Sequence, residues 1–254
     1  MTNINNKRFD ILGVKISAID MADAWCIIDT LVAKKQKGYV CVCPVSTIVE
    51  CNRNEDYRNL VNNAAIVTPD GMPTVWIARA RGLKHVERVY GPDLMLAVCQ
   101  LCEQKGYKQY FYGGTEKVLA KLQVSLKSKF PNLKISGAYS PPFRELTKEE
   151  DIAIVNRINT AAPDILWVGI GAPRQDFWMV NHQAKLNVPV MLGVGAAFDF
   201  LSGVKPQAPR WIQRSGLEWF FRLCTEPHRL WKRYLIGNSI FVYLLVKSLF
   251  RNKS

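Results

Sequence analysis

An aspartate stands between a proline and a glycine in the stretch AAIVTPDGMPTVW, residues 64–76. The residues before it are apolar, as in a buried strand, and the residues after it have the period of a helix. A carboxylate at this place can cap the helix, or it can take a proton from a substrate as a general base. Asp70 is therefore the first candidate catalytic residue, with helix capping as the alternative.

Glycines follow two further apolar runs, in VGIGAPRQDFW (168–178) and LGVGAAFDFL (192–201). Neither stretch completes G-x-G-x-x-G, so the dinucleotide fingerprint is not met. Glycines at a strand end still let backbone amides approach a phosphate, and the next helix adds a partial positive charge. We expect phosphate or diphosphate binding at Gly171 and Gly195, with tight turns alone as the alternative.

The elements that must position these residues alternate along the chain. Strands are expected at 10–17, 39–45, 65–68, 109–112, 133–138, 165–170 and 190–194, and helices at 20–35, 47–62, 72–81, 92–105, 115–129 and 148–160. This alternation predicts an α/β fold with a Rossmann-like, doubly wound, mainly parallel sheet. In such sheets ligands bind beyond the carboxyl ends of the strands, where Asp70, Gly113, Gly171 and Gly195 fall.

The net charge is high and lies mostly at one end. The 254 residues carry a formal charge of +13, although the hydrophobic content of 48% is ordinary for a globular protein. From Lys205 to the last residue there are ten basic residues and two acidic ones. This predicts an anionic partner: nucleic acid, a phosphorylated ligand or an anionic membrane surface.

The basic end also has a distinct pattern. Residues 204–254 are rich in tryptophan and helical in period, with expected breaks at Pro227 and Gly237. The last apolar run, 239–250, is about half of the roughly 20 residues that a spanning helix needs. We expect a catalytic domain at 1–203 and a helical, membrane-associating appendage at 204–254 that lies in the membrane interface. A helix packed on the core, with solvated cations, is the alternative.

The cysteines and the start of the chain indicate a reducing compartment. Seven cysteines, an odd number, lie mostly in apolar stretches, and the start MTNINNKRFD has no apolar segment. We expect reduced thiols in the cytoplasm.

No metal or other cofactor is expected. The chain has no D-x-D, and its three histidines have no carboxylate or cysteine neighbours at ligand spacing. If a nucleoside diphosphate leaves in the reaction, arginine forks must neutralise it instead. The candidates are Arg88, Arg222, Arg229 and Arg233.

Two other polar positions remain ambiguous. Gln175 and Asp176 open the helix after the first glycine loop, where they can contact a ligand or match the helix dipole. Asp199 in FDF can hold its loop or meet a ligand.

Several linked motifs occur in order: TPDGMPTVW, ERVYGPDLM, GIGAPRQDFW, GVGAAFDFLSG and APRWIQRSGLEWFFRL…EPHRLWKRYL. Together they resemble the WecG/TagA/CpsF glycosyltransferase family (family 26), over about residues 8–240. The resemblance implies an inverting, metal-independent transfer of a hexose or N-acetylhexosamine-type sugar from a UDP-sugar to a polyprenyl-diphosphate-linked saccharide. It places this reaction in cell-surface polysaccharide synthesis, at the cytoplasmic face of the membrane, in a peripheral enzyme. The sequence leaves two oligomeric states open, a monomer and a small homo-oligomer.

The resemblance also assigns roles to residues. Asp70 is the general base, Arg88 lies by the donor and Gln175 contacts it. The appendage closes over the site, and Arg222, Arg229 and Arg233 steady the diphosphate. Many members carry an asparagine after the second strand, where this chain reads CPVSTIVE, so Ser46 or Thr47 is expected to take over a sugar contact.

Two other classes of protein remain as alternatives. In a basic-tailed nucleic-acid-binding α/β protein, the tryptophans of the tail would stack on bases and its arginines would bind phosphates. The terminal run is too apolar for a solvated arm, so we expect no nucleic-acid partner. A nucleotide-dependent oxidoreductase is disfavoured by the incomplete glycine fingerprint.

Overall fold

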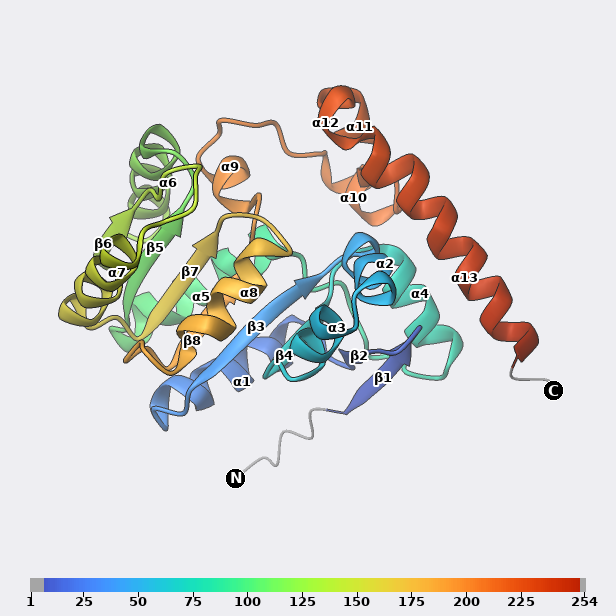
Figure 1. Cartoon of the computed structure of the whole chain (residues 1–254), viewed down its shortest axis with the longest axis horizontal. Coiled ribbons are helices and arrows are strands. Elements are labelled where there is room, and N and C mark those ends of the chain that lie inside the picture. Colours follow the sequence, from blue (N-terminus) through green and yellow to red (C-terminus); the bar gives the residue numbers. More distant parts are fainter. Residues whose placement is uncertain (1–6, 252–254) are drawn as a thin grey trace.

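The computed structural model describes residues 7–251 and contains one large sheet (Figure 1). Most of the polar start and Lys253 lie outside the described residues. The sheet has the order β4-β3-β8-β7-β5-β6, and all neighbouring strands pair in parallel. Its strands are β3 (Gly38–Cys43), β4 (Ile66–Pro69), β5 (Lys108–Gly113), β6 (Lys134–Tyr139), β7 (Ile165–Gly169) and β8 (Val190–Gly193). The predicted α/β fold is confirmed.

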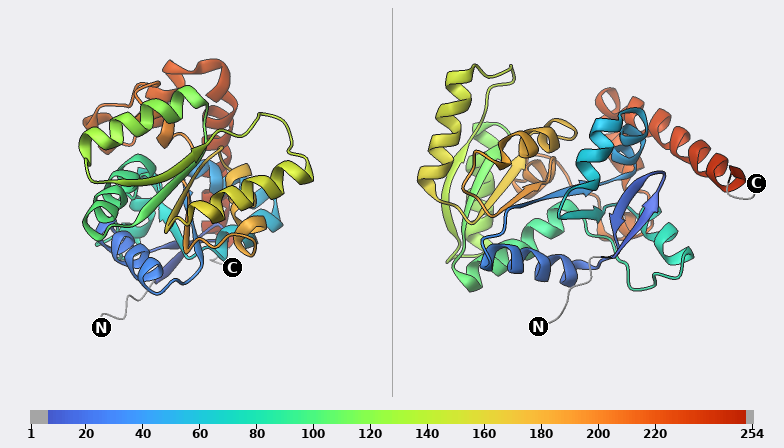
Figure 2. Two further views of the ribbon diagram at one scale, coloured as in Figure 1. Left: turned by 90° about the vertical axis from the view of Figure 1, so that its left-hand side faces the viewer. Right: turned by 60° about the horizontal axis from the view of Figure 1, so that its bottom comes forward.

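Helices cover both faces of this sheet, which explains why the central strands are apolar on both sides (Figure 2). One face packs against α2 (Val45–Arg53), α3 (Glu55–Asn62), α7 (Lys148–Ala161) and α8 (Arg174–Gln183). The other face packs against α1 (Met21–Ala33), α5 (Gly91–Lys105), α6 (Glu116–Lys129) and α9 (Ala197–Leu201). The sheet is therefore doubly wound.

Two predicted elements are divided in the structure. The first strand-like stretch is a hairpin of β1 (Arg8–Ile11) and β2 (Val14–Ser17), which form a separate antiparallel sheet. The single helix expected at 47–62 is wrong, because Asn54 has an extended backbone and its side chain accepts a hydrogen bond from the backbone amide of Tyr57. An asparagine in this role begins a new helix.

After a loop that leads from α9 to α10, the C-terminal segment is mainly helical (Figure 1). Its elements are α10 (Arg210–Arg214), α11 (Glu218–Thr225), α12 (Pro227–Trp231), the π-helical turn η1 (Lys232–Ile236) and α13 (Gly237–Arg251). The break expected at Gly237 is wrong, because this residue has helical backbone angles and the helix continues through it. Packing of α13 on α2, where Phe241 is buried, offsets the helix cost of a glycine, about 1 kcal/mol.

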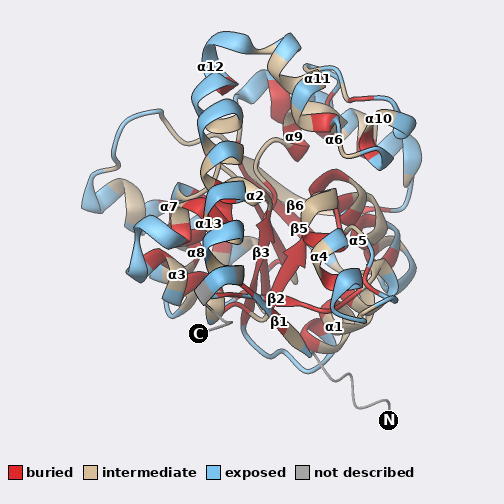
Figure 3. Cartoon of the chain, turned by 90° about the vertical axis from the view of Figure 1, so that its right-hand side faces the viewer, coloured by how far each residue is buried: buried red, intermediate tan, exposed pale blue. Residues whose placement is uncertain are grey.

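The outer side of α13 is exposed, whereas the strands form the buried centre of the molecule (Figure 3). Within the described part of the chain, none of the helices has the length and apolar character needed to cross a bilayer.

Gly113, at the carboxyl end of β5, is required by the close approach of two strands. Its φ is +124°, and a Cβ atom there would lie 2.6 Å from the backbone of Gly169 in β7. Gly82, after α4 (Met72–Ala80), has a similar φ of +86° but no atom within 4 Å of the Cβ position. The two glycines share the backbone strain and differ in the steric overlap.

We expect Gly113→Ala to destabilise the protein more than Gly82→Ala. The strained φ alone costs about 1–2 kcal/mol, and overlap in a packed interior adds roughly 1–3 kcal/mol. Urea unfolding of both variants measures the difference. Equal losses in the free energy of unfolding would show that Gly113 is not needed for the contact between β5 and β7.

Candidate active site

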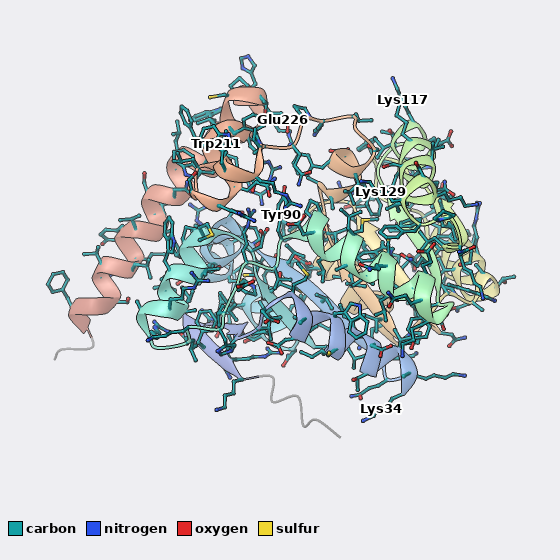
Figure 4. All side chains as sticks on the ribbon, turned by 180° about the vertical axis from the view of Figure 1, so that it is seen from behind. Lys34, Tyr90, Lys117, Lys129, Trp211 and Glu226 are labelled. Carbon is teal, nitrogen blue, oxygen red and sulfur yellow. The ribbon has the colours of Figure 1, made fainter. Side chains whose placement is uncertain are left out.

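A cavity opens at the carboxyl edge of the sheet, between the strand ends and the C-terminal helices. Ser46, Asp70, Gly171 and Gly195, which follow β3, β4, β7 and β8, line one side. Glu218, Arg222, Arg229 and Arg233 line the other. Figure 4 shows Tyr90, which also lines the cavity, in the middle of the molecule, below Trp211 of α10 and Glu226, which lies between α11 and α12. Carboxyl ends of parallel strands are where such folds bind ligands.

Asp70 does not cap the helix that follows it. The N-cap of α4 is Gly71, with a φ of +112°, and no side chain caps that helix end. The Asp70 carboxylate instead accepts a hydrogen bond from Arg88, 3.3 Å from Nη2 to Oδ1. The capping alternative is therefore wrong, and the carboxylate faces the cavity edge.

Arg88 is shared between two carboxylates. Its Nη2 lies 2.6 Å from Oε2 of Glu218 and 3.3 Å from Oδ1 of Asp70. The guanidinium also lies over the ring of Tyr90, 4.1 Å from the ring centroid. The side chains of Asp70, Arg88 and Glu218 are only 14%, 15% and 11% exposed, so the three charges interact with little screening by water.

Burial raises the pKa of Asp70 above its ordinary value, although the neighbouring charge of Arg88 acts in the opposite direction. A carboxylate with a raised pKa is a stronger base than an exposed one, because it holds a transferred proton more tightly. Asp70 thus combines access to the cavity with the electrostatics of a proton acceptor.

Two of the predicted arginines are enclosed without a carboxylate. Arg233 donates from Nε and Nη2 to Oγ of Ser46, at 2.9 and 2.7 Å, and burial lowers its pKa. Arg222 lies over the ring of Phe200, 5.2 Å from its centroid. Within residues 7–251 neither guanidinium forms an ion pair, whereas the more exposed Arg229 pairs with Glu226 at 2.7 Å. Half-buried cations without a carboxylate partner attract an anionic ligand.

Gln175 and Asp176 begin α8, and only the first lines the cavity. Oε1 of Gln175 accepts a hydrogen bond from the backbone amide of Gly171 at 3.2 Å, which fixes the glycine loop. The Asp176 carboxylate is buried behind the cavity, where Tyr57 donates a hydrogen bond to it at 2.6 Å. Burial raises the pKa of Asp176 to about 6.

The structure leaves three predicted site residues off this cavity. Gly113 belongs to the contact between β5 and β7, as described above. Thr47 is buried in the first turn of α2. Asp199 pairs with Lys205 at 3.0 Å, and its carbonyl accepts from the backbone amides of Val204 and Lys205, so it holds its loop. The other predicted residues lie on the cavity together.

Glu218 is the site residue that the sequence analysis did not select. Its partner Arg88 lies 130 positions away in the chain, so no local pattern joins them. One signal was present: Glu218 is one of only two carboxylates in the basic C-terminal segment, and it lies between Leu217 and Trp219.

No group of three or more His, Cys, Asp or Glu side chains that could hold a metal ion occurs within residues 7–251. Metal independence stays a prediction.

A Rossmann-like sheet with a buried carboxylate and unpaired arginines at its carboxyl edge defines an enzyme that acts on an anionic substrate. A family model described as "Glycosyl transferase WecG/TagA/CpsF family" matches residues 9–254. The chain belongs to this family, and it is a glycosyltransferase. Family membership decides against the nucleic-acid-binding and oxidoreductase alternatives.

Curated relatives agree with this assignment. A protein of Bacillus spizizenii named N-acetylglucosaminyldiphosphoundecaprenol N-acetyl-beta-D-mannosaminyltransferase is 31% identical over 186 residues, which cover 73% of this chain and 70% of the relative. A protein of the same name from Staphylococcus aureus is 27% identical over 248 residues, which cover 96% of this chain and 94% of the relative.

We expect Asp70→Asn to stabilise the protein at pH 7.5. A carboxyl group whose pKa is raised by folding favours the folded state when protonated, and this contribution is lost as the pH rises through the raised pKa. The variant removes the free-energy cost of the buried charge. Its gain in the free energy of unfolding therefore becomes smaller toward pH 4, where the wild-type carboxyl group is protonated. Urea unfolding at both pH values measures the effect.

Asp151→Asn is the control with the opposite sign. Burial alone would raise the pKa of Asp151, but hydrogen bonds from His182 and Lys185 lower it below its ordinary value. Its ionised form stabilises the fold at neutral pH, so the control loses stability there and less in acid. A loss of stability for Asp70→Asn at pH 7.5 would contradict the raised pKa of Asp70.

Proposed function

We propose that the protein is an inverting glycosyltransferase that moves a hexose or N-acetylhexosamine-type sugar from a UDP-sugar to a polyprenyl-diphosphate-linked saccharide. The reaction belongs to cell-surface polysaccharide synthesis. The relatives named above are N-acetylmannosaminyltransferases whose printed acceptor is N-acetylglucosaminyldiphosphoundecaprenol, so N-acetylmannosamine is the first donor sugar to test.

The observation that carries this proposal is the place of Asp70, a buried carboxylate on the cavity at the end of β4. In the proposed reaction the acceptor hydroxyl gives its proton to Asp70 while its oxygen attacks the anomeric carbon. The bond between that carbon and the diphosphate oxygen breaks at the same time, and its electron pair leaves with UDP. Attack opposite to the leaving group inverts the anomeric centre.

The leaving diphosphate needs positive charge, and we assign this role to Arg222, Arg229 and Arg233. Arg222 and Arg233 have no carboxylate partner in the described residues, and all three arginines line the cavity opposite the glycine loops. Arginine forks bind diphosphate oxygens in bidentate geometry. No resident metal ion or cofactor enters the proposal.

We assign the donor-side contacts to the strand-end loops. Gly171, Gly195 and Gln175 form a polar wall on which the backbone approaches the cavity, and a Cβ atom at Gly171 would have no other atom within 4 Å. Ser46 lies on the same cavity next to Arg233, where its hydroxyl suits a sugar contact.

We assign residues 204–254 to an appendage that binds the cytoplasmic face of the membrane peripherally, and residues 1–203 to the catalytic domain. Val242, Val246 and the neighbouring Tyr243 are 58%, 47% and 62% exposed on α13. The opposite side of this helix buries Phe241 against the body. An exposed apolar face beside a cation, here Lys247, is typical of helices that lie in a membrane interface.

The test of the reaction uses UDP-N-acetylmannosamine and a synthetic lipid-diphosphate N-acetylglucosamine, with mass spectrometry of the product. We expect the wild-type enzyme to add one sugar, with or without EDTA. Asp70→Asn lowers the turnover by about 10²–10⁴-fold, because general-base catalysis contributes this much. Its affinity for the UDP-sugar stays near that of wild type.

Asp151→Asn is the matched control, since it removes a carboxylate remote from the cavity and keeps near-wild-type turnover. Full turnover in Asp70→Asn would remove Asp70 as the base, and loss of activity in EDTA would contradict metal independence. No transfer from a panel of UDP-sugars would contradict the proposed donor.

The membrane assignment is tested with anionic phospholipid vesicles. We expect Val242→Glu combined with Val246→Glu to weaken co-sedimentation by at least about tenfold, because each apolar side chain contributes roughly 1.5 kcal/mol or more when buried. Val124→Glu, at a valine of α6 that is 72% exposed, is the control and leaves binding unchanged. Equal binding of the double variant would exclude this face of α13 as the membrane contact.

A further inference from the structure

We infer that Glu218 is a positioning residue that draws Arg88 toward itself, weakens the hydrogen bond from Arg88 to Asp70 and so keeps the Asp70 carboxylate available to accept a proton. This inference rests on the proposed function for its catalytic meaning. Its structural part concerns three charged side chains that the chain itself brings together.

The geometry shows an unequal sharing of one cation. The same nitrogen of Arg88, Nη2, is 2.6 Å from Glu218 and 3.3 Å from Asp70. The stronger hydrogen bond is the shorter one, so Arg88 is held mainly by Glu218. The ring of Tyr90 under the guanidinium and the carbonyl oxygen of Gln213, 3.5 Å from Nη1, favour the same position.

Glu218 is a built part of this site. Among the described residues that line the cavity, Asp70 and Glu218 are the only carboxylates. Glu218 is the first residue of α11 and is buried. A carboxylate is expensive to bury unless a cation pairs with it, and Arg88 is the ion-pair partner that the structure provides.

Several neighbouring titratable groups affect the pKa of Asp70. Burial raises the pKa of Asp70, the charge of Glu218 raises it further, and the charges of Arg88 and Arg222 lower it. The other titratable groups that interact with Asp70 are Tyr90, Cys43, Arg233 and Tyr234.

An arginine bound to Asp70 alone would stabilise the ionised carboxylate and weaken it as a base. Glu218 counteracts this in two ways, since it draws the shared cation toward itself and adds a negative charge nearby. Because Glu218 comes from α11, the strength of the base depends on contact between the C-terminal helices and the sheet edge.

The test is a titration of the Asp70 carboxyl carbon by ¹³C NMR in the full-length protein without substrate, with the signal assigned from Asp70→Asn. In Glu218→Gln we expect the midpoint to move to lower pH, because Arg88 then pairs with Asp70 and a negative charge is lost. This readout does not require that the proposed reaction is correct.

The matched control is Asp93→Asn. Asp93 of α5 pairs with Arg210 of α10 at 2.6 Å, so this variant also removes an ion pair between the body and the C-terminal helices. Its midpoint for Asp70 stays at the wild-type value. An unchanged or raised midpoint in Glu218→Gln, or an equal shift in Asp93→Asn, would overturn the inference.

The transfer assay supplies the functional readout. Glu218→Gln lowers kcat by about tenfold with the acid limb of its pH profile displaced to lower pH, since a weaker base is also ionised in more acidic solution. A rise in KM with no displacement of the acid limb of the pH profile would instead show that Glu218 only holds the C-terminal helices against the body. If the wild type transfers no sugar, the proposed function fails while the titration still decides the inference.

Glu218→Asp keeps the test open if the glutamine variant does not fold. This variant retains the negative charge, but its carboxylate is shorter by one methylene and holds Arg88 less closely. We therefore expect the titration midpoint of Asp70 to lie below that of the wild type and above the midpoint expected for Glu218→Gln. A midpoint equal to that of the wild type would count against the inference.

Discussion

The enclosed charge of Arg88 is the constraint on which the site depends. A guanidinium at the edge of a sheet, with little access to water, requires carboxylate partners. Asp70 from the sheet and Glu218 from the C-terminal helices supply them. One cation thereby fixes the side chain at the end of β4, the loop that carries Arg88, and the start of α11. The parts that line the cavity are joined by electrostatics as well as by packing.

Two other arginines of the cavity have no carboxylate partner within the described residues. Arg222 and Arg233 lie on the cavity and form no ion pair within residues 7–251, although arginine is costly to enclose. A diphosphate would neutralise both cations and remove this cost. The excess positive charge of the C-terminal segment thus includes two kinds of cation: arginines that line the cavity, and exposed residues such as Lys232 and Lys247 on the outer helices. Only the first kind is expected to recognise a substrate.

The sheet could be predicted from the sequence because buried parallel strands are continuous apolar runs, as in β3 and β7. Asp70 could be selected because it falls between an apolar strand and a helix, and Arg88 because a leaving diphosphate needs a cation, and the family resemblance then assigned their roles. Glu218 could not be found in this way, since its role depends on a contact across 130 positions. Local signals also failed where packing decides the outcome. Gly237 is a poor helix residue, yet α13 continues through it because its apolar side packs on α2.

The absence of a break at Gly237 gives the C-terminal segment a mechanical property. From Pro227 to Arg251 the backbone is one helical rod, and its two ends meet different surroundings. Arg229 and Arg233 sit near one end on the cavity, and Val242 and Val246 face outward further along. The helical backbone runs between these two parts through the π-helical turn η1, and Phe241 packs on the body beyond that turn. One continuous helical run thus connects the arginines of the cavity with the outward-facing valines.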